Sequence, residues 1–386
     1  MSDRKYKPGK HFLQLPGPSN VPDRILNAMC YPTIDHRGPE FSELALKCLG
    51  GIKTIFKTLN PVIIFPASGT GAWEAALVNT LNDGDNVLMV ETGHFASLWN
   101  NMAQKLGLKV ELLKTDWRQG LDPNEIEKRL RLDADKKIKA VCIVHNETST
   151  GCTSDVKAVR EILDNLNHDA LLMVDSISGL ASMNYEHDEW GVDITISGSQ
   201  KGLMLPPGLS FNAISEKAIN ASKKSGLKKS YWDWNEHLEF NRTGFFPYTP
   251  ATNLLFGLKE AIEMLHEEGL TNVFKRHARY SKATRIAVNA WGLEVYCQNE
   301  KRFSDVLTAV LVPENKDADQ LRKIILENFN MSLGNGLSKL KGKVFRIGHL
   351  GDFNDISLLG TLSGVEMGLD LIQIPVSYTH LRAHET

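Results

Sequence analysis

The chain has 386 residues, of which 42% are hydrophobic and 23% are charged, so it can bury a substantial core and is not a disordered protein. Its 44 Lys and Arg residues nearly balance its 46 Asp and Glu residues, and the resulting net charge of −2 disfavours a protein built to bind nucleic acid. At roughly 150 residues per domain, the length suggests about two to three domains.

The sequence also suggests neither a secretory signal nor a cysteine framework. The first ten residues are polar and basic and do not lead into the apolar segment of a secretory signal. No run approaches the roughly 18 apolar residues of a membrane span. The five cysteines are odd in number and contain no C-x-x-C pair, which disfavours a disulfide framework or a four-cysteine zinc site. We therefore expect a cytoplasmic protein with reduced thiols, no metal and no membrane partner.

Short apolar runs alternate with amphipathic runs between residues 62 and 215. Continuous apolar runs predict strands of a parallel sheet with both faces covered, and their alternation with helices predicts an α/β domain. Asp122 and Pro123 mark the start of one helix, as N-cap and first helical residue. Ile126 and Leu130 follow at helical spacing and should face the core. The predicted strands are 62–65, 86–90, 140–145, 170–175, 193–197 and 209–214.

After about Pro250 the pattern changes to longer helices, which predicts a smaller α+β domain. Gly269 lies between two helical runs and suits a helix C-terminus. The last residues, 376–386, have no apolar periodicity and read as a non-native or disordered tail. The predicted elements are helices 253–266 and 271–290, a strand 306–312, a helix 321–329, a strand 344–347 and a helix 358–371.

Small residues fill the segment 66–73, which follows the strand 62–65 and opens a helix near Ala72. Small residues let a backbone approach a ligand closely, and the free N–H groups of a helix N-terminus attract phosphate. The segment is not a Walker A loop, and Glu74 stands where the dinucleotide fingerprint needs a third glycine. An ordinary helix cap explains this segment as well as an anion site does.

An acid and a lysine follow two other predicted strands. Asp175 ends the strand 170–175, at the edge where α/β sheets bind ligands, although it could equally cap the next segment. Lys201 follows the strand 193–197 among small residues, and a desolvated lysine there favours reaction with a carbonyl, whereas a surface lysine is the default. Pyridoxal phosphate requires three groups together: a cradle for its phosphate, an acid for its pyridinium nitrogen and an amine for its aldehyde.

With these motifs, the sequence resembles the class V, fold type I pyridoxal-phosphate aminotransferases, specifically their serine–glyoxylate and alanine–glyoxylate branch. The resemblance implies a large domain with a mainly parallel seven-stranded sheet between helices, and a smaller C-terminal α+β domain. The corresponding boundaries are an N-terminal arm at 1–20, a large domain at 21–255 and a small domain at 256–375. The runs that carry the resemblance are 68–74 (SGTGAWE), 145–151 (HNETSTG), 198–201 (GSQK) and 345–351 (FRIGHLG).

The resemblance also implies a role for individual residues. Lys201 would carry the cofactor covalently, and Asp175 would face its pyridinium nitrogen. Arg346 would hold the substrate carboxylate, a task that suits a planar guanidinium. The other cofactor contacts would be Ser68, Gly69, Thr70 and Gln200 at the phosphate, Phe95 on the ring, Thr148 beside its O3′ atom, and Thr249 from a second subunit.

The implied reaction is a ping-pong transamination that converts glyoxylate to glycine in a homodimer with shared active sites. Serine is the first expected donor, giving hydroxypyruvate, and alanine and aspartate are alternatives. The donor stays open because His36, near the expected substrate entrance, replaces the tyrosine that plant-type members carry before the arginine corresponding to Arg37. The chain also diverges from the family after Pro375.

Other function classes fit the residues less well. The H-x-E at 145–147 resembles that of zinc deaminases, but no P-C-x-x-C follows. A nicotinamide oxidoreductase would need G-x-G-x-x-G, and a non-enzymatic binding protein would not need Lys201 and Asp175 together. A class V desulfurase or lyase is the nearest rival, but it would need a reactive cysteine on a mobile loop, and none of the five cysteines sits in an evident one.

Overall fold

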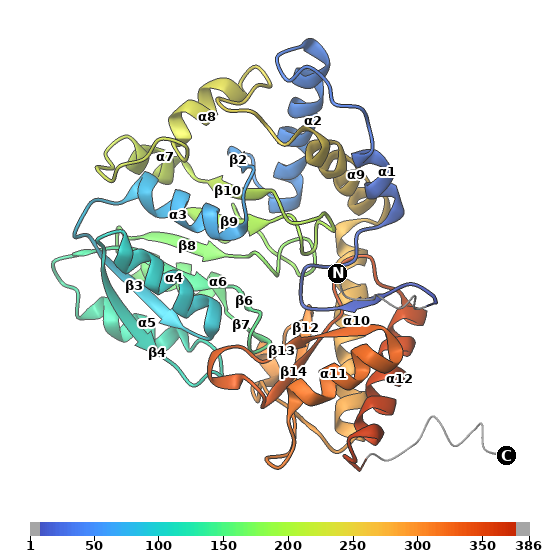
Figure 1. The fold of residues 1–386 in the computed structure, drawn as a ribbon. Helices are drawn as coiled ribbons and strands as arrows, with labels where there is room; N and C mark the ends of the chain where they lie inside the picture. The colour runs from blue at the N-terminus through green and yellow to red at the C-terminus, as the bar shows by residue number, and fades with distance from the viewer. Residues whose placement is uncertain (1–7, 376–386) are drawn as a thin grey trace.

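The computed structural model describes residues 8–375, so the predicted tail 376–386 lies outside the described residues. In the described part, a seven-stranded sheet and a five-stranded sheet organise the fold (Figure 1). From one edge to the other, the larger sheet contains β2 (Val62–Phe65), β10 (Ser210–Ile214), β9 (Ile194–Gly198), β8 (Leu171–Asp175), β5 (Ile138–Val144), β3 (Asn86–Glu91) and β4 (Lys109–Lys114).

The strands expected between residues 62 and 215 are all present in this sheet, with small differences at their ends. The structure adds β4, an edge strand that is half-exposed along most of its length and therefore lacks a continuous apolar run. β10 runs antiparallel to both β2 and β9, so the expectation of a parallel strand is wrong there, while the other neighbouring strands pair in parallel. Apolarity reveals burial on both faces but not strand direction.

Alternate residues of the larger sheet pack into two cores, one on each face. On β2, Val62 and Ile64 belong to one core, whereas Ile63 and Phe65 belong to the other. Because helices cover both faces, these strands need no polar alternation. The first core includes α2 (Pro39–Phe56), α5 (Pro123–Arg131), α6 (Val156–Asn165) and α9 (Thr252–Glu268), and the second includes α3 (Gly69–Thr80), α4 (His94–Lys105), α7 (Glu216–Ser222) and α8 (Trp234–Asn241).

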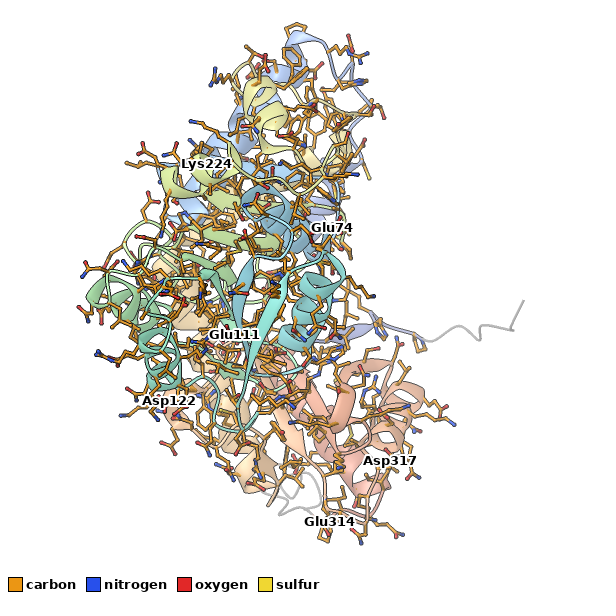
Figure 2. All side chains as sticks on the ribbon, turned by 90° about the vertical axis from the view of Figure 1, so that its left-hand side faces the viewer. Glu74, Glu111, Asp122, Lys224, Glu314 and Asp317 are labelled. Atoms are coloured by element: carbon orange, nitrogen blue, oxygen red, sulfur yellow. The ribbon has the colours of Figure 1, made fainter. Side chains whose placement is uncertain are left out.

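Two helix starts test the sequence predictions directly. Asp122, labelled in Figure 2, lies at the start of α5. It caps the helix, because its carboxylate accepts a hydrogen bond from the Asn124 amide at 3.0 Å. This N-cap is confirmed, and so are the buried positions of Ile126 and Leu130. The predicted start of α3 near Ala72 is wrong, since the helix begins three residues earlier, directly after Ser68 in extended conformation. The earlier start puts residues 69–72 of the small-residue segment in the first helical turn.

The smaller sheet joins the beginning of the chain to its end (Figure 1). β1 (Phe12–Gln14) pairs in parallel with β13 (Met331–Asn335), and neither strand is among the predicted elements. The sheet continues through β14 (Val344–Gly348), β12 (Leu307–Leu311) and β11 (Glu294–Val295), which pair antiparallel. Its core also takes residues from α10 (Leu270–Ala290), α11 (Ala318–Phe329) and α12 (Asp355–Leu371).

The remaining elements are short. Gly269, with φ of 80°, ends α9 and begins α10, as its sequence position suggested. Among residues 8–375, no helix has the length and apolar character that crossing a membrane requires. The other elements are α1 (Asp23–Met29), the hairpin of β6 (Asn146–Glu147) and β7 (Cys152–Thr153), and two 3₁₀ turns at Glu300–Arg302 and Ser338–Leu340.

Candidate active site

The carboxyl ends of β2, β3, β5, β8 and β9 lie at one edge of the larger sheet, since β10 is antiparallel to both β2 and β9 and the other pairs are parallel. The segments that follow these strands surround a cavity at this edge, where α/β folds commonly bind ligands. The predicted residues that line it are Ser68, Gly69, Thr70, Phe95, Thr148, Asp175, Gln200 and Lys201. The cavity is also lined by Trp73, Val144, Asn146 and Ile177, for which the sequence predicted no role.

The first turn of α3 forms one end of the cavity. The amides of Gly69 and Thr70 belong to the helix N-terminus, where N–H groups lack intrahelical partners and favour an anion. A Cβ atom on Gly69 would lie 2.4 Å from the end of the Ile177 side chain, so a larger residue there would displace Ile177 from the cavity wall. Gln200 also lines the cavity, and its buried Oε1 atom has no hydrogen-bond partner among the described residues.

Asp175, the last residue of β8, is buried, and two donors hold its carboxylate. The Trp73 indole Nε1 donates to Oδ2 at 3.0 Å, and the Ile177 amide donates to Oδ1 at 2.7 Å. Burial raises the pKa of Asp175 to about 7, against the effect of these hydrogen bonds, and the nearby Glu147 charge raises it further. Trp73 lies one turn after Gly69 on α3, and this spacing could have placed it on the same face of the helix.

The Lys201 side chain is buried beside the N-terminal segment. Its Nζ atom donates a hydrogen bond of 2.7 Å to the carbonyl oxygen of Pro16. Burial lowers the pKa of Lys201 to about 8, the Arg346 charge adds to this effect, and the Asp175 charge opposes it. The Ser19 hydroxyl donates to the Lys201 carbonyl at 2.9 Å, which ties residues 16–19 to the lysine loop. This segment therefore covers one side of the lysine.

Arg346 reaches the site from β14 of the smaller sheet. It is only 6% exposed, so the surface salt bridge that is the default for a lone arginine does not apply. Its Nε donates to the Asn335 carbonyl and its Nη1 to the Thr148 carbonyl, each at 2.7 Å. A guanidinium carries five N–H donors, so these two bonds leave donors for a ligand carboxylate. Burial lowers the pKa of Arg346 to about 10, which keeps it cationic near neutral pH.

Glu147 is a fully buried acid in the short strand β6, which follows β5, and no separate role was predicted for it. Its carboxylate accepts hydrogen bonds from the Ala96 amide at 3.2 Å and from the Ser149 hydroxyl at 2.6 Å. The first contact anchors the start of α4, which carries Phe95 into the cavity wall. The carboxylate also favours the charged form of Arg346. Glu147 thus links the helix that bears Phe95 to the buried arginine.

Besides Arg346, which lies beside the cavity, two predicted residues do not line the cavity of this one chain in its described part. His36 is half-buried in the turn before α2, and Thr249 is exposed in the connection between α8 and α9. Cys30 is exposed, the other four cysteines are buried, and none of the five lines the cavity. Within residues 8–375, no group of three or more His, Cys, Asp and Glu side chains could hold a metal ion.

A family model described as aminotransferase class-V matches residues 14–337. The chain belongs to this family. Serine–glyoxylate aminotransferases of Arabidopsis thaliana and Methylorubrum extorquens are 45% and 48% identical to it, over 97% and 94% of this chain and 94% and 92% of theirs. An L-aspartate–glyoxylate aminotransferase of Paracoccus denitrificans is 41% identical over 94% of this chain and 92% of its own.

Solved structures agree with this assignment. The crystal structure of an alanine–glyoxylate aminotransferase from Nostoc sp. has a TM-score of 0.89 and 28% identity, and the match covers 96% of this chain and 98% of that one. The class V aminotransferase therefore has fold type I, with the large helix-covered sheet that the sequence predicted. Enzymes of this family and fold depend on pyridoxal 5′-phosphate.

Proposed function

We propose that this aminotransferase transfers the amino group of L-serine to glyoxylate, giving hydroxypyruvate and glycine, with pyridoxal 5′-phosphate as its cofactor. The observation that carries the proposal is the meeting of Lys201 and Asp175 in one cavity that has a helix N-terminus at its end. The cationic Arg346 lies beside this cavity, since it donates to the carbonyl of Thr148 and lowers the pKa of Lys201. The serine–glyoxylate enzymes at 45% and 48% identity support the choice of substrates.

The cavity fits the cofactor in its chemistry. Gln200 Oε1 and Asn146 Oδ1 are buried, line the cavity and have no hydrogen-bond partner among residues 8–375, which is costly unless a ligand supplies one. We assign the phosphate to Ser68, Gly69, Thr70 and Gln200, the ring face to Phe95, the ring O3′ atom to Thr148, and the ring nitrogen to Asp175. When bound, the cofactor supplies the electron sink of the reaction.

In the proposed mechanism Lys201 moves the proton. Its pKa of about 8 makes the neutral amine accessible near physiological pH, as a general base requires. The amine would take the proton from the donor's Cα atom. It would then return this proton to the cofactor carbon C4′, which is bonded to the transferred nitrogen. Asp175 would hold the ring nitrogen protonated throughout. The segment from Pro16 to Ser19 covers the lysine and would limit the access of water.

Arg346 would orient both substrates. An amino acid donor and glyoxylate share a carboxylate next to the reacting carbon, so one arginine can hold each in turn in a ping-pong reaction. The backbone carbonyls of Asn335 and Thr148 fix the guanidinium before a substrate arrives, which reduces the entropic cost of binding. A carboxylate would pair with the remaining N–H donors.

Aspartate–glyoxylate and alanine–glyoxylate transfer are the alternative activities, and the 41% identical aspartate–glyoxylate relative favours the first of them. A screen of single half-reactions decides among them: the loaded enzyme is mixed with serine, alanine or aspartate, and the cofactor absorbance is followed. We expect serine to react fastest, and Lys201→Ala serves as the unreactive control. If aspartate reacts faster than serine, aspartate becomes the assigned donor. Release of sulfide from cysteine would indicate the desulfurase alternative.

We further propose a cytoplasmic homodimer with shared active sites, built from an arm (1–20), a large domain (21–255) and a small domain (256–375). Exposed Thr249 would contact the phosphate in the partner's site, and His36 would lie near the substrate entrance. Complementation tests this arrangement. Lys201→Ala and Thr249→Glu should each be inactive alone, whereas mixed dimers should regain one intact site. No recovery on mixing would contradict a shared site.

A further inference from the structure

Trp73 lines the cavity and contacts Asp175, yet the proposed reaction gives it no part. It lies on α3 and is 2% exposed, and its indole Nε1 donates to Asp175 Oδ2 at 3.0 Å. We propose that Trp73 is a positioning residue for Asp175, whose indole N–H fixes the carboxylate toward the ring nitrogen of the cofactor and keeps it anionic. This inference rests on the proposed function, because Asp175 needs its charge only if a pyridinium nitrogen lies beside it.

The electrostatic surroundings of Asp175 make a donor at this position important. Glu147 raises its pKa, and burial raises it more, whereas Lys201 lowers it. Tyr185 and His145 also pack near the end of β8; burial raises the pKa of the phenol and lowers the pKa of the imidazole to about 4, so both are neutral at pH 7. The anion is therefore held by Lys201 and by hydrogen bonds, and Trp73 provides the one to Oδ2.

The indole is fixed by a second tryptophan. Trp73 stacks on Trp99 of α4, with ring centroids 5.8 Å apart and an interplanar angle of 13°. Both rings are almost fully buried, so Trp73 cannot turn its N–H away without disturbing the pair. The Nε1 atom of Trp99 is also buried, but it has no hydrogen-bond partner among residues 8–375. The stacked pair thus contains one indole N–H that contacts Asp175 and one that contacts no acceptor.

This difference provides a matched pair of variants. Trp73→Phe and Trp99→Phe each shorten one ring of the same stack, but only the first removes a hydrogen bond to Asp175. The loss of a hydrogen bond to a charged group corresponds to about a tenfold to hundredfold change in a rate or equilibrium constant. At pH 7 we expect Trp73→Phe to slow the half-reaction with serine by this factor and to move the acidic limb of its pH profile about one to two units higher. Trp99→Phe should stay within about twofold of the wild type.

The serine KM should change little in Trp73→Phe, because Arg346 is untouched. Equal losses in the two variants, or an unshifted pH profile in Trp73→Phe, would overturn the inference. An inactive wild type would instead contradict the proposed function, so the two failures are distinguishable.

A measurement on the cofactor-free protein tests the contact without any reaction. The chain has seven tryptophans, which can be labelled with ¹⁵N at the indole nitrogen and resolved by NMR. One indole signal should shift as Asp175 titrates near pH 7, should be missing in Trp73→Phe, and should stay constant with pH in Asp175→Asn. Indole signals that are the same in the wild type and in Asp175→Asn at every pH between 5 and 9 would overturn the inference, even if Trp73→Phe fails to fold.

Discussion

The Nζ atom of Lys201 donates a 2.7 Å hydrogen bond to the carbonyl oxygen of Pro16, 185 residues earlier in the chain. A Cβ atom on the next residue, Gly17, would lie 2.2 Å from that same Nζ atom, and Gly17 has a φ of 121°. Close approach and backbone conformation therefore both require glycine at position 17. The arm is part of the wall that holds the lysine, and the lysine's reactivity depends on it.

Replacing Lys201 with alanine should lower turnover by at least about a thousandfold, since the residue would supply the general base as well as the covalent link. The cofactor should still bind through the α3 cradle but should be lost on dialysis. Turnover and retained cofactor absorbance measure both effects. Lys224→Ala, on an exposed surface residue, is the control (Figure 2). Near-normal turnover of Lys201→Ala would remove this lysine from the mechanism.

Covalent loading of the cofactor should accelerate as the pH rises through about 8, because the neutral amine of Lys201 is the nucleophile. Arg346 lowers the pKa of Lys201, so Arg346→Gln should move the midpoint of loading to higher pH. Arg346→Lys keeps the positive charge and should leave the midpoint unchanged. Loading rates followed by absorbance between pH 6 and 10 test this, and identical midpoints in all three proteins would contradict the electrostatic coupling.

Arg346→Lys should weaken serine and glyoxylate together, because an ammonium cannot reproduce the planar fork of a guanidinium. The loss of one charge-assisted hydrogen bond corresponds to about 2 kcal/mol, or roughly thirtyfold in kcat/KM. The cofactor spectrum should remain intact, since Arg346 does not line the cofactor cavity. Stopped-flow measurement of each half-reaction is the test, and a loss confined to one substrate would show that the other is held elsewhere.

Asp175 should make the cofactor-free protein less stable as the pH rises. Its pKa is about 7 in the folded chain, whereas the ordinary value for an aspartate is 3.8, so between these values the folded chain binds more protons than the unfolded chain. The free energy of unfolding then falls with rising pH. Asp175→Asn removes this dependence and should be more stable than the wild type at pH 8 by up to a few kcal/mol, at about 1.4 kcal/mol per pKa unit.

Urea unfolding at pH 5 and pH 8 measures the difference in the free energy of unfolding between Asp175→Asn and the wild type. This difference should be smaller at pH 5 than at pH 8. Asp169→Asn, at an exposed carboxyl, is the control. In the loaded enzyme the same Asp175→Asn change should slow proton removal by about 1.5–3 kcal/mol in the barrier, because an amide cannot hold the ring nitrogen charged. A difference in stability that is equal at both pH values would contradict the raised pKa.

Most of the site residues that the sequence could predict lie at or just after the ends of predicted strands. Asp175 and Lys201 each follow an apolar run, and the carboxyl ends of parallel strands share an edge, so local pattern suffices to bring them together. Contacts between distant segments follow no such pattern. The direction of β10, the indole bond of Trp73 and the carbonyl of Pro16 are decided by how helices and loops pack, which a run of residue types does not encode.

The pairing of β1 with β13 imposes an order on biosynthesis. Phe12 pairs with Met331, so β1 can pair only after the residues near 331 have been translated. Until then β1 is an unpaired strand, which is a hazard for aggregation in a nascent chain. Lys201 is made well before β13, so the lysine and Pro16 are both translated before β1 gains its strand partner. The arm beside Lys201 therefore gains its place in the smaller sheet only after the residues that line the cavity have been translated.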